Sequence, residues 1–385
     1  MNESKPADGP ERASIGHGGA RGRPDERGFL DQVLTRAQRA PQRVAFPEAY
    51  DPAMLRAAAI LAERGVATPL LVGDAPRLVA LISDLGFDPS AFEFADVEDR
   101  AASGRLAARY AALPDAVLSG NALKRRLSDP LRFAMALQAV GDVAVVSAGL
   151  TAATAEVITA AAEMLGLKPD ALTPSSVGIA DIPAPGGGWQ LALADVVVSP
   201  DPDAATLADI AINACQAVAR MTGWETRCAL LSFSTDGSAP HALTDKVREA
   251  VGIVQTERPD LTVDGEFQLD AALDPRVAAK KVKRPSPVAG RANVLIFPDL
   301  NAGNIGVKLI QRIGQAKYYG VVLQGFRGVM AESSRSATAD ELVGTIALAV
   351  IDAAGGDSLA ESAGAGGHRT AATQRPDNHG SIGRN

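Results

Sequence analysis

The sequence predicts an α/β fold in which buried parallel strands alternate with helices. Short apolar runs, such as Val-Leu-Ile-Phe at 294–297, are too short for a helix and too continuous for a half-exposed strand. Such runs are followed by polar, turn-forming residues and then by apolar residues at helical spacing. The chain has 385 residues, of which 46% are hydrophobic, so it can form two domains with cores of their own.

The first half of the chain alternates between the two kinds of element. We expect helices over 28–40, 53–64 and 131–140 and strands over 43–48, 68–72 and 143–147, with a further helix beginning after 73–74. Asp51-Pro52 supplies an N-cap and a first-turn proline for the second of these helices. Because strands joined by helices cross over in parallel with a right-handed sense, we expect a doubly wound sheet.

A Pro/Gly-rich segment, PSSVGIADIPAPGGGW, interrupts this pattern and indicates either a crossing between domains or a hairpin at the edge of a new sheet. A second α/β region follows it. Its expected strands are 191–198, 228–233, 294–297 and 319–323, and its expected helices are 201–221, 243–258, 305–313 and 340–353. Residues 1–27 and 356–385 contain little to bury, and we predict disordered tails there.

The composition argues against several classes of protein. A net charge of -7 argues against a nucleic-acid partner, which would need a basic surface. No apolar run approaches the roughly 20 residues of a membrane span, and the N-terminus has no apolar signal core, so we expect a cytoplasmic protein without a membrane partner. The two cysteines and four scattered histidines predict buried thiols, no metal site and no Ser-His-Asp triad.

Four expected strands end in polar loops, at 147–149, 232–238, 298–304, and 324–325 together with 332–336. If the sheets are parallel, these loops lie at carboxyl ends and can converge on one cleft. Hydroxyls, amides and one arginine suit a tetrahedral oxyanion such as phosphate, although turn formation and helix capping explain each loop taken alone. The candidate ligands of such an anion are Ser234, Thr235, Ser238, Asp299, Asn301, Asn304 and Gln324.

The most suggestive cluster is Ser334-Arg335 followed by Asp340-Glu341. A carboxylate so close to an arginine can form an ion pair or perform acid/base chemistry. Acidic residues at the start of a helix are also stabilised by the helix dipole. Both interpretations remain open from the residues alone.

Several motifs resemble the phosphate acetyltransferase/phosphate butyryltransferase family. The resemblance covers roughly residues 28–354 and is densest from Leu230 to Arg335. It is carried by FPE at 46–48, LSFSTDGS at 231–238, DKVREA at 245–250, DGEFQLDAA at 264–272, SPVAGRANVLIFPDLNAGN at 286–304, LQG at 323–325 and SR at 334–335.

The resemblance implies a fold of two three-layer αβα domains, related to isocitrate and isopropylmalate dehydrogenases, with the active cleft between them. The second domain is inserted in the first. Domain 1 would therefore comprise 28–169 and 321–355, and domain 2 would comprise 170–320.

The resemblance also implies acyl transfer between CoA and inorganic phosphate, without a metal or a cofactor, in a homodimer. Arg335 would bind the phosphoryl oxygens, Ser334 would hydrogen-bond the charge developing at the acyl centre, and Glu341 would take the proton of the CoA thiol.

The chain departs from the family pattern at several positions. Thr151 stands where the family has a histidine, and Ile158 where it has an arginine. A second family arginine has no partner in the segment 110–114, and Ser336 and Ala337 replace a glycine and a cysteine. The preferred function is phosphate acetyltransferase, acetyl-CoA plus phosphate giving acetyl phosphate plus CoA. The alternative is a catalytically weak family member that binds an acyl-CoA or acyl phosphate as a sensor or regulatory subunit.

Overall fold

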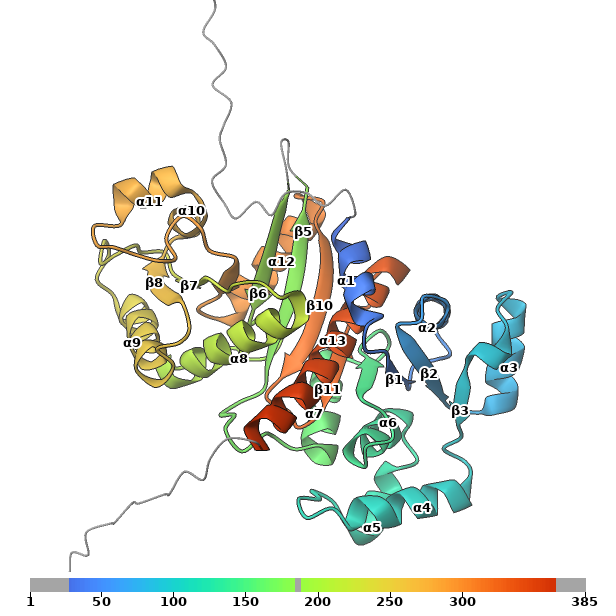
Figure 1. Ribbon diagram of the computed structural model, residues 1–385. Helices are drawn as coiled ribbons and strands as arrows, with labels where there is room; N and C mark the ends of the chain where they lie inside the picture. The colour runs from blue at the N-terminus through green and yellow to red at the C-terminus, as the bar shows by residue number, and fades with distance from the viewer. Residues whose placement is uncertain (1–27, 184–187, 365–385) are drawn as a thin grey trace, which may run out of the picture.

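The computed structural model describes residues 28–183 and 188–364 (Figure 1). The predicted tail 1–27 and residues 365–385 of the second predicted tail lie outside the described residues. Within the described ranges, eleven strands form one sheet in the order β3-β2-β1-β4-β11-β10-β5-β6-β9-β7-β8. The strands are β1 (Gln42–Phe46), β2 (Ala67–Val72), β3 (Glu93–Ala95), β4 (Val145–Ala148), β5 (Ser175–Ile182), β6 (Trp189–Ala194), β7 (Cys228–Leu231), β8 (Val263–Phe267), β9 (Val294–Ile296), β10 (Lys317–Gln324) and β11 (Val329–Glu332).

Two parallel sets of strands make up most of the sheet, as the apolar runs predict. β1, β2, β3, β4 and β11 form one set, and β6, β7, β8 and β9 form the other. β5 runs antiparallel to both β10 and β6, and β10 runs antiparallel to β11. The two parallel sets therefore point in opposite directions along the sheet.

The Pro/Gly-rich segment forms a hairpin, since β5 and β6 pair in antiparallel register from Gly178 with Leu193 to Ile182 with Trp189. Its predicted place at a sheet edge is wrong, because β5 and β6 lie in the middle of the sheet and join its two halves (Figure 1). Both strands are buried along most of their length, because other parts of the chain cover both of their faces.

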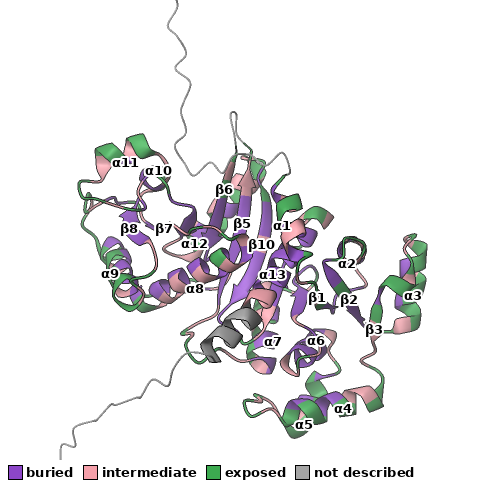
Figure 2. Cartoon of the chain, in the orientation of Figure 1, coloured by how far each residue is buried: buried purple, intermediate pink, exposed green. Residues whose placement is uncertain are grey.

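Helices cover both faces of the sheet. They are α1 (Phe29–Ala37), α2 (Pro52–Glu63), α3 (Ala75–Asp84), α4 (Arg100–Ala111), α5 (Gly120–Arg126), α6 (Pro130–Ala139), α7 (Thr154–Met164), α8 (Ala204–Thr222), α9 (Ala242–Glu257), α10 (Leu269–Leu273), α11 (Pro275–Lys281), α12 (Leu300–Arg312) and α13 (Ala339–Gly364), with a 3-10 turn at Pro89–Ala91. One core packs α1, α2, α8, α9 and α13 on one face, and a second core packs α6, α7 and α12 on the other (Figure 2). Three layers result.

Two helix ends differ from the prediction by five residues or more. α12 begins at Leu300 rather than at 305, because the Asp299 side chain accepts a hydrogen bond from Ala302 N (2.9 Å) and caps the helix. α13 continues to Gly364, so residues 356–364 are helical and not part of a disordered tail. The predicted domain boundary at 321 falls inside β10, and the division into domains stays a prediction.

Within the described residues, no helix combines the length and the apolar character that crossing a membrane requires. Both cysteines, Cys215 and Cys228, are buried free thiols, as predicted. Burial raises the pKa of the Cys228 thiol well above its usual value.

Candidate active site

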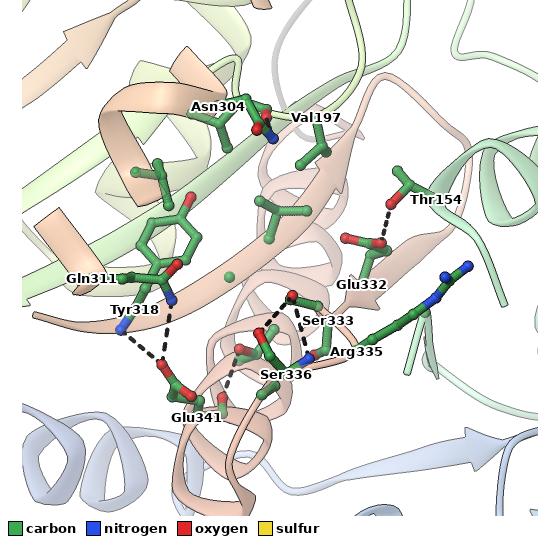
Figure 3. A pocket seen from close by; sticks show the side chains of 18 of the residues that line it. Thr154, Val197, Asn304, Gln311, Tyr318, Glu332, Ser333, Arg335, Ser336 and Glu341 are labelled. Carbon is green, nitrogen blue, oxygen red and sulfur yellow. Dashed lines mark hydrogen bonds between the residues drawn. The ribbon is translucent and has the colours of Figure 1, made fainter. Parts of the chain in front are cut away.

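A pocket of about 300 Å³ lies where the carboxyl ends of β4 and β11 meet α12 and the start of α13 (Figure 3). It brings together Ser334, Arg335, Glu341 and Asn304, four of the residues that the sequence singles out. The pocket is lined by the segments that follow β4, β6 and β11, so both halves of the chain contribute to it.

Ser334 and Arg335 lie in the short loop between β11 and α13, and both are exposed. The Ser334 hydroxyl lies 3.2 Å from that of Ser336, and the two form a hydrogen bond. Arg335 forms no ion pair within the part of the chain that the structure describes, and its guanidinium extends away from Glu341 (Figure 3). A planar cation with five donors at the mouth of a pocket can bind a phosphoryl group.

The Glu341 side chain is hydrogen-bonded to the residue that precedes α13. Its Oε2 accepts hydrogen bonds from Thr338 N (2.9 Å) and Thr338 Oγ1 (3.0 Å), while Glu341 N donates back to Thr338 Oγ1 (3.3 Å). These reciprocal bonds form a capping box. Oε1 also accepts longer bonds from Gln311 Nε2 (3.5 Å) and Tyr318 N (3.4 Å). The carboxylate therefore caps the start of the helix and also lines the pocket, and within the described residues it forms no ion pair with Arg335. An acid/base role for Glu341 stays a prediction.

Glu332, at the end of β11, is a pocket residue that the sequence did not single out as a candidate ligand. It is 4% exposed, and its Oε1 accepts a hydrogen bond from Thr154 Oγ1 (2.6 Å). Burial raises the pKa of Glu332, and the negative charge of Glu48 raises it further, while Thr154 and Lys308 act in the opposite direction. An acid following a short apolar run is the only signal that could have identified it.

Gly149 makes room for this buried acid. Its backbone φ of 96° disfavours residues with a side chain, and a Cβ there would lie 2.8 Å from Glu332 Cγ. Glu48 holds the same loop by accepting hydrogen bonds from Leu150 N and Ala152 N, each 2.8 Å long. The predicted loop after β4 is therefore built around two carboxylates.

α12 contributes a second cation. Asn304, Lys308 and Gln311 line the pocket from one face of the helix, as their spacing of four and three residues requires. Lys308 is exposed, and together with Arg335 it places two positive side chains around the cavity. The predicted helix included Lys308, but its spacing along the chain could not show that this side chain faces the pocket.

The loop after β7 lies outside this pocket. Ser234 Oγ donates to Glu266 Oε1 (2.7 Å) and lies 3.2 Å from Ser238 Oγ, and Thr235 Oγ1 accepts from Gln268 N (2.9 Å). These hydrogen bonds show that the polar side chains of this loop stabilise the loop itself. A phosphate-binding role for the three residues stays a prediction.

Asp299 and Asn301 also lie outside the pocket, the first as the cap of α12 and the second exposed on its first turn. The placement of Gln324 at the cleft is wrong. Leu323 pairs with Met330 near the start of β11, so Gln324 lies at the amino ends of β11 and β4, opposite the pocket. The error follows from treating β10 as parallel.

Ile158, one of the departures from the family pattern, lies on α7 and is half-buried against the second core. It does not line the pocket, whereas Thr154, one turn earlier on the same helix, does. In the described parts of the chain, no group of three or more His, Cys, Asp or Glu side chains is arranged to hold a metal ion.

A family model described as "Phosphate acetyl/butaryl transferase" matches residues 28–350. The phosphate acetyltransferase of Acetivibrio thermocellus is 33% identical over 331 residues, which cover 84% of this chain and 98% of that protein. The phosphate acetyltransferase of Thermoanaerobacterium thermosaccharolyticum is 35% identical over 329 residues, covering 84% of this chain and 99% of that protein.

Two solved structures resemble the chain over nearly the whole length of each. The phosphotransacetylase from Streptococcus pyogenes superimposes with a TM-score of 0.78 at 29% identity, covering 85% of this chain and 99% of that one. The EutD phosphotransacetylase from Staphylococcus aureus superimposes with a TM-score of 0.75 at 27% identity, covering 84% and 99%. The predicted fold class is confirmed by these neighbours.

Proposed function

Because the chain belongs to the phosphate acetyl/butaryl transferase family, we propose that it transfers an acyl group between CoA and inorganic phosphate, with acetyl as the preferred acyl group. It is an acyltransferase. The observation that carries the proposal is the single pocket that gathers Ser334, Arg335 and Glu341.

In the proposed reaction, the CoA thiolate attacks the carbonyl carbon of acyl phosphate, the bond from that carbon to the phosphate oxygen breaks, and phosphate leaves. Arg335 binds the phosphoryl oxygens, with Lys308 as a second cation at the same cavity. Ser334 donates a hydrogen bond to the carbonyl oxygen as it becomes an oxyanion. Glu341 takes the thiol proton, which needs only modest help because a free thiol has a pKa of about 8.5.

The second candidate function, an acyl-CoA or acyl-phosphate sensor, is favoured by one observation. The Glu341 carboxylate already accepts hydrogen bonds from Thr338, Gln311 and Tyr318, and these bonds occupy oxygen lone pairs that would otherwise face the CoA thiol.

A coupled assay of the purified protein with acetyl phosphate and CoA, following thioester formation, separates the two functions. Turnover within about 1 to 1000 per second supports the enzyme. If no acyl phosphate is turned over but acetyl-CoA raises the melting temperature, the chain is a sensor. Propionyl and butyryl phosphates, assayed in parallel, define the acyl group.

Arg335→Ala tests the phosphate site. We expect kcat/KM for acetyl phosphate to fall by about 100-fold or more, because a charged hydrogen bond to an anion contributes roughly 1.5 to 3 kcal/mol and this variant removes two donors at once. Arg105→Ala, at an exposed arginine of α4 outside the pocket, is the matched control. A loss of similar size in both variants would contradict the assignment.

Ile158→Arg tests the departure from the family pattern. We expect it to raise turnover by restoring a cation, with the arginine stem lying along the core surface that Ile158 contacts. The melting temperature is measured beside the rate, so that a folding defect is recognised. Unchanged turnover in a folded variant would show that the missing arginine is not what limits the enzyme.

The proposal includes a metal-free reaction without a bound cofactor, a cytoplasmic location and a homodimer. The location is supported by the two reduced, buried thiols and by the use of CoA as substrate. The homodimer is supported by an exposed apolar ridge on α12, formed by Ile305, Leu309 and Ile313, which are 57%, 51% and 76% exposed. A second copy of the chain would cover this ridge.

A further inference from the structure

One wall of the pocket is formed by an aromatic ring whose position has no role in the proposed chemistry. Tyr318, near the start of β10, lines the pocket together with Val196, Val197, Val307 and Val321. It is 7% exposed, and its ring lies beside Gln311 with the hydroxyl end directed toward the side where Asn304 lies (Figure 3). The four valines and the ring supply the apolar lining of the cavity, and Asn304 and Gln311 of α12 supply polar groups beside the ring.

The ring rests in a slot that two glycines leave open. A Cβ at Gly178 of β5 would lie 2.5 Å from Tyr318 Cζ and closer still to the hydroxyl oxygen. A Cβ at Gly320 would lie 3.3 Å from Tyr318 Cε1. No side chain from either position fills the space under the ring, so the ring lies directly against the sheet backbone at Gly178 and Gly320.

The hydroxyl does not explain why the ring lies there. It is buried and has no hydrogen-bond partner in the parts of the chain that the structure describes. An unpartnered buried hydroxyl destabilises its own position, so the volume of the ring is the property that this arrangement preserves.

The proposed base contacts the residue that carries this ring. Glu341 Oε1 accepts a hydrogen bond from the backbone N of Tyr318 (3.4 Å), and Glu341 is the proposed base for the CoA thiol. The acyl carbonyl must lie within one bond of that sulfur, and the carbons beyond it then extend into the adjacent apolar part of the cavity. We propose that Tyr318 forms the floor of the acyl-chain site and limits the length of the acyl group, so that short acyl groups fit and longer ones do not. This inference rests on the proposed acyl transfer.

Three variants make the test. Tyr318→Ala removes the floor down to Gly178, and Tyr318→Phe keeps the ring and removes only the hydroxyl. Gly178→Ala pushes the ring into the pocket from below. The measurement is kcat/KM with acetyl, propionyl and butyryl phosphates, expressed as the ratio of butyryl to acetyl.

We expect Tyr318→Ala to raise the ratio by about 10-fold or more, since each methylene in an apolar site contributes a factor of roughly 10 to 200. Gly178→Ala should lower the ratio by about 10-fold, because the longer chain loses its space first. Tyr318→Phe should leave the ratio within about twofold of the wild type. If Tyr318→Ala leaves the ratio unchanged, or if Tyr318→Phe shifts it as far as Tyr318→Ala does, the inference is wrong.

The affinities of the same proteins for acetyl-CoA and butyryl-CoA, measured by calorimetry, distinguish a failure of this inference from a failure of the proposed function. A wild type that turns over no acyl phosphate contradicts the proposed enzyme, yet Tyr318→Ala must still gain affinity for butyryl-CoA over acetyl-CoA if the ring limits the site. A wild type that is active while the variant gains neither turnover nor binding of the longer chain contradicts the acyl-chain floor alone. If acetyl-CoA and butyryl-CoA bind to none of the proteins, both proposals fail.

Discussion

A buried carboxyl group lies at the end of β11, in contact with the candidate active site. Glu332 is almost fully buried, and its pKa is raised mainly by burial and then by the charge of Glu48. An acid with a higher pKa in the folded state than in the unfolded state binds more protons when folded. Its contribution to stability is therefore greatest below its unfolded pKa, roughly 4.3, and is lost as the pH rises through the folded value.

We predict that Glu332→Gln stabilises the protein at neutral pH and has little effect near pH 4. The amide oxygen can still accept the hydrogen bond from Thr154, while the buried charge is removed. The measurement is the free energy of unfolding by denaturant over a pH series. Glu63→Gln, at an exposed acid of α2, is the control, and a pH-independent difference for Glu332→Gln would contradict the buried-charge account.

At the scale of the element, the start of α13 holds the active-site loop. The capping box between Thr338 and Glu341 satisfies backbone N–H groups at this end and fixes where the helix begins, four residues after Arg335. The same two residues therefore set the position of a carboxylate at the pocket and the end of the Ser334-Arg335 loop.

We predict that Thr338→Ala lowers the free energy of unfolding by about 1 kcal/mol, the usual effect of losing a side-chain cap. Thr338→Ser keeps a hydroxyl in the same place and should retain most of the stability. Thermal unfolding of both variants provides the comparison. Equal losses in the two would mean that the threonine methyl group, and not the cap, stabilises the helix.

At the scale of the whole molecule, the apolar ridge of α12 tests the proposed dimer. Ile305, Leu309 and Ile313 recur every four residues, so they share one face of the helix. We predict that Leu309→Glu halves the mass measured by light scattering, because it places a charge in an apolar interface. Leu172→Glu, at another exposed leucine, should leave the mass unchanged. A wild type that is already monomeric would rule out the proposed homodimer.

Sequence reasoning alone predicted the fold class, most of the long helices and strands, and the Ser334-Arg335-Glu341 cluster. These are local properties, since apolar periodicity, caps such as Asp51 and short motifs are readable from neighbouring residues. The same local reasoning left several elements unassigned, among them α5, β3 and β11, because short elements with mixed polarity give weak periodic signals.

Which polar loops meet could be seen only in the folded chain. An apolar run does not reveal the direction of its strand, so Gln324 was placed at the wrong edge of the sheet. The antiparallel pairings among β11, β10, β5 and β6 also reverse the direction of the second parallel set relative to the first. Glu332, Lys308 and Tyr318 become pocket residues through contacts between segments far apart in the chain. Burial, partner and pKa are properties of that packing, which is why no spacing along the sequence could reveal them.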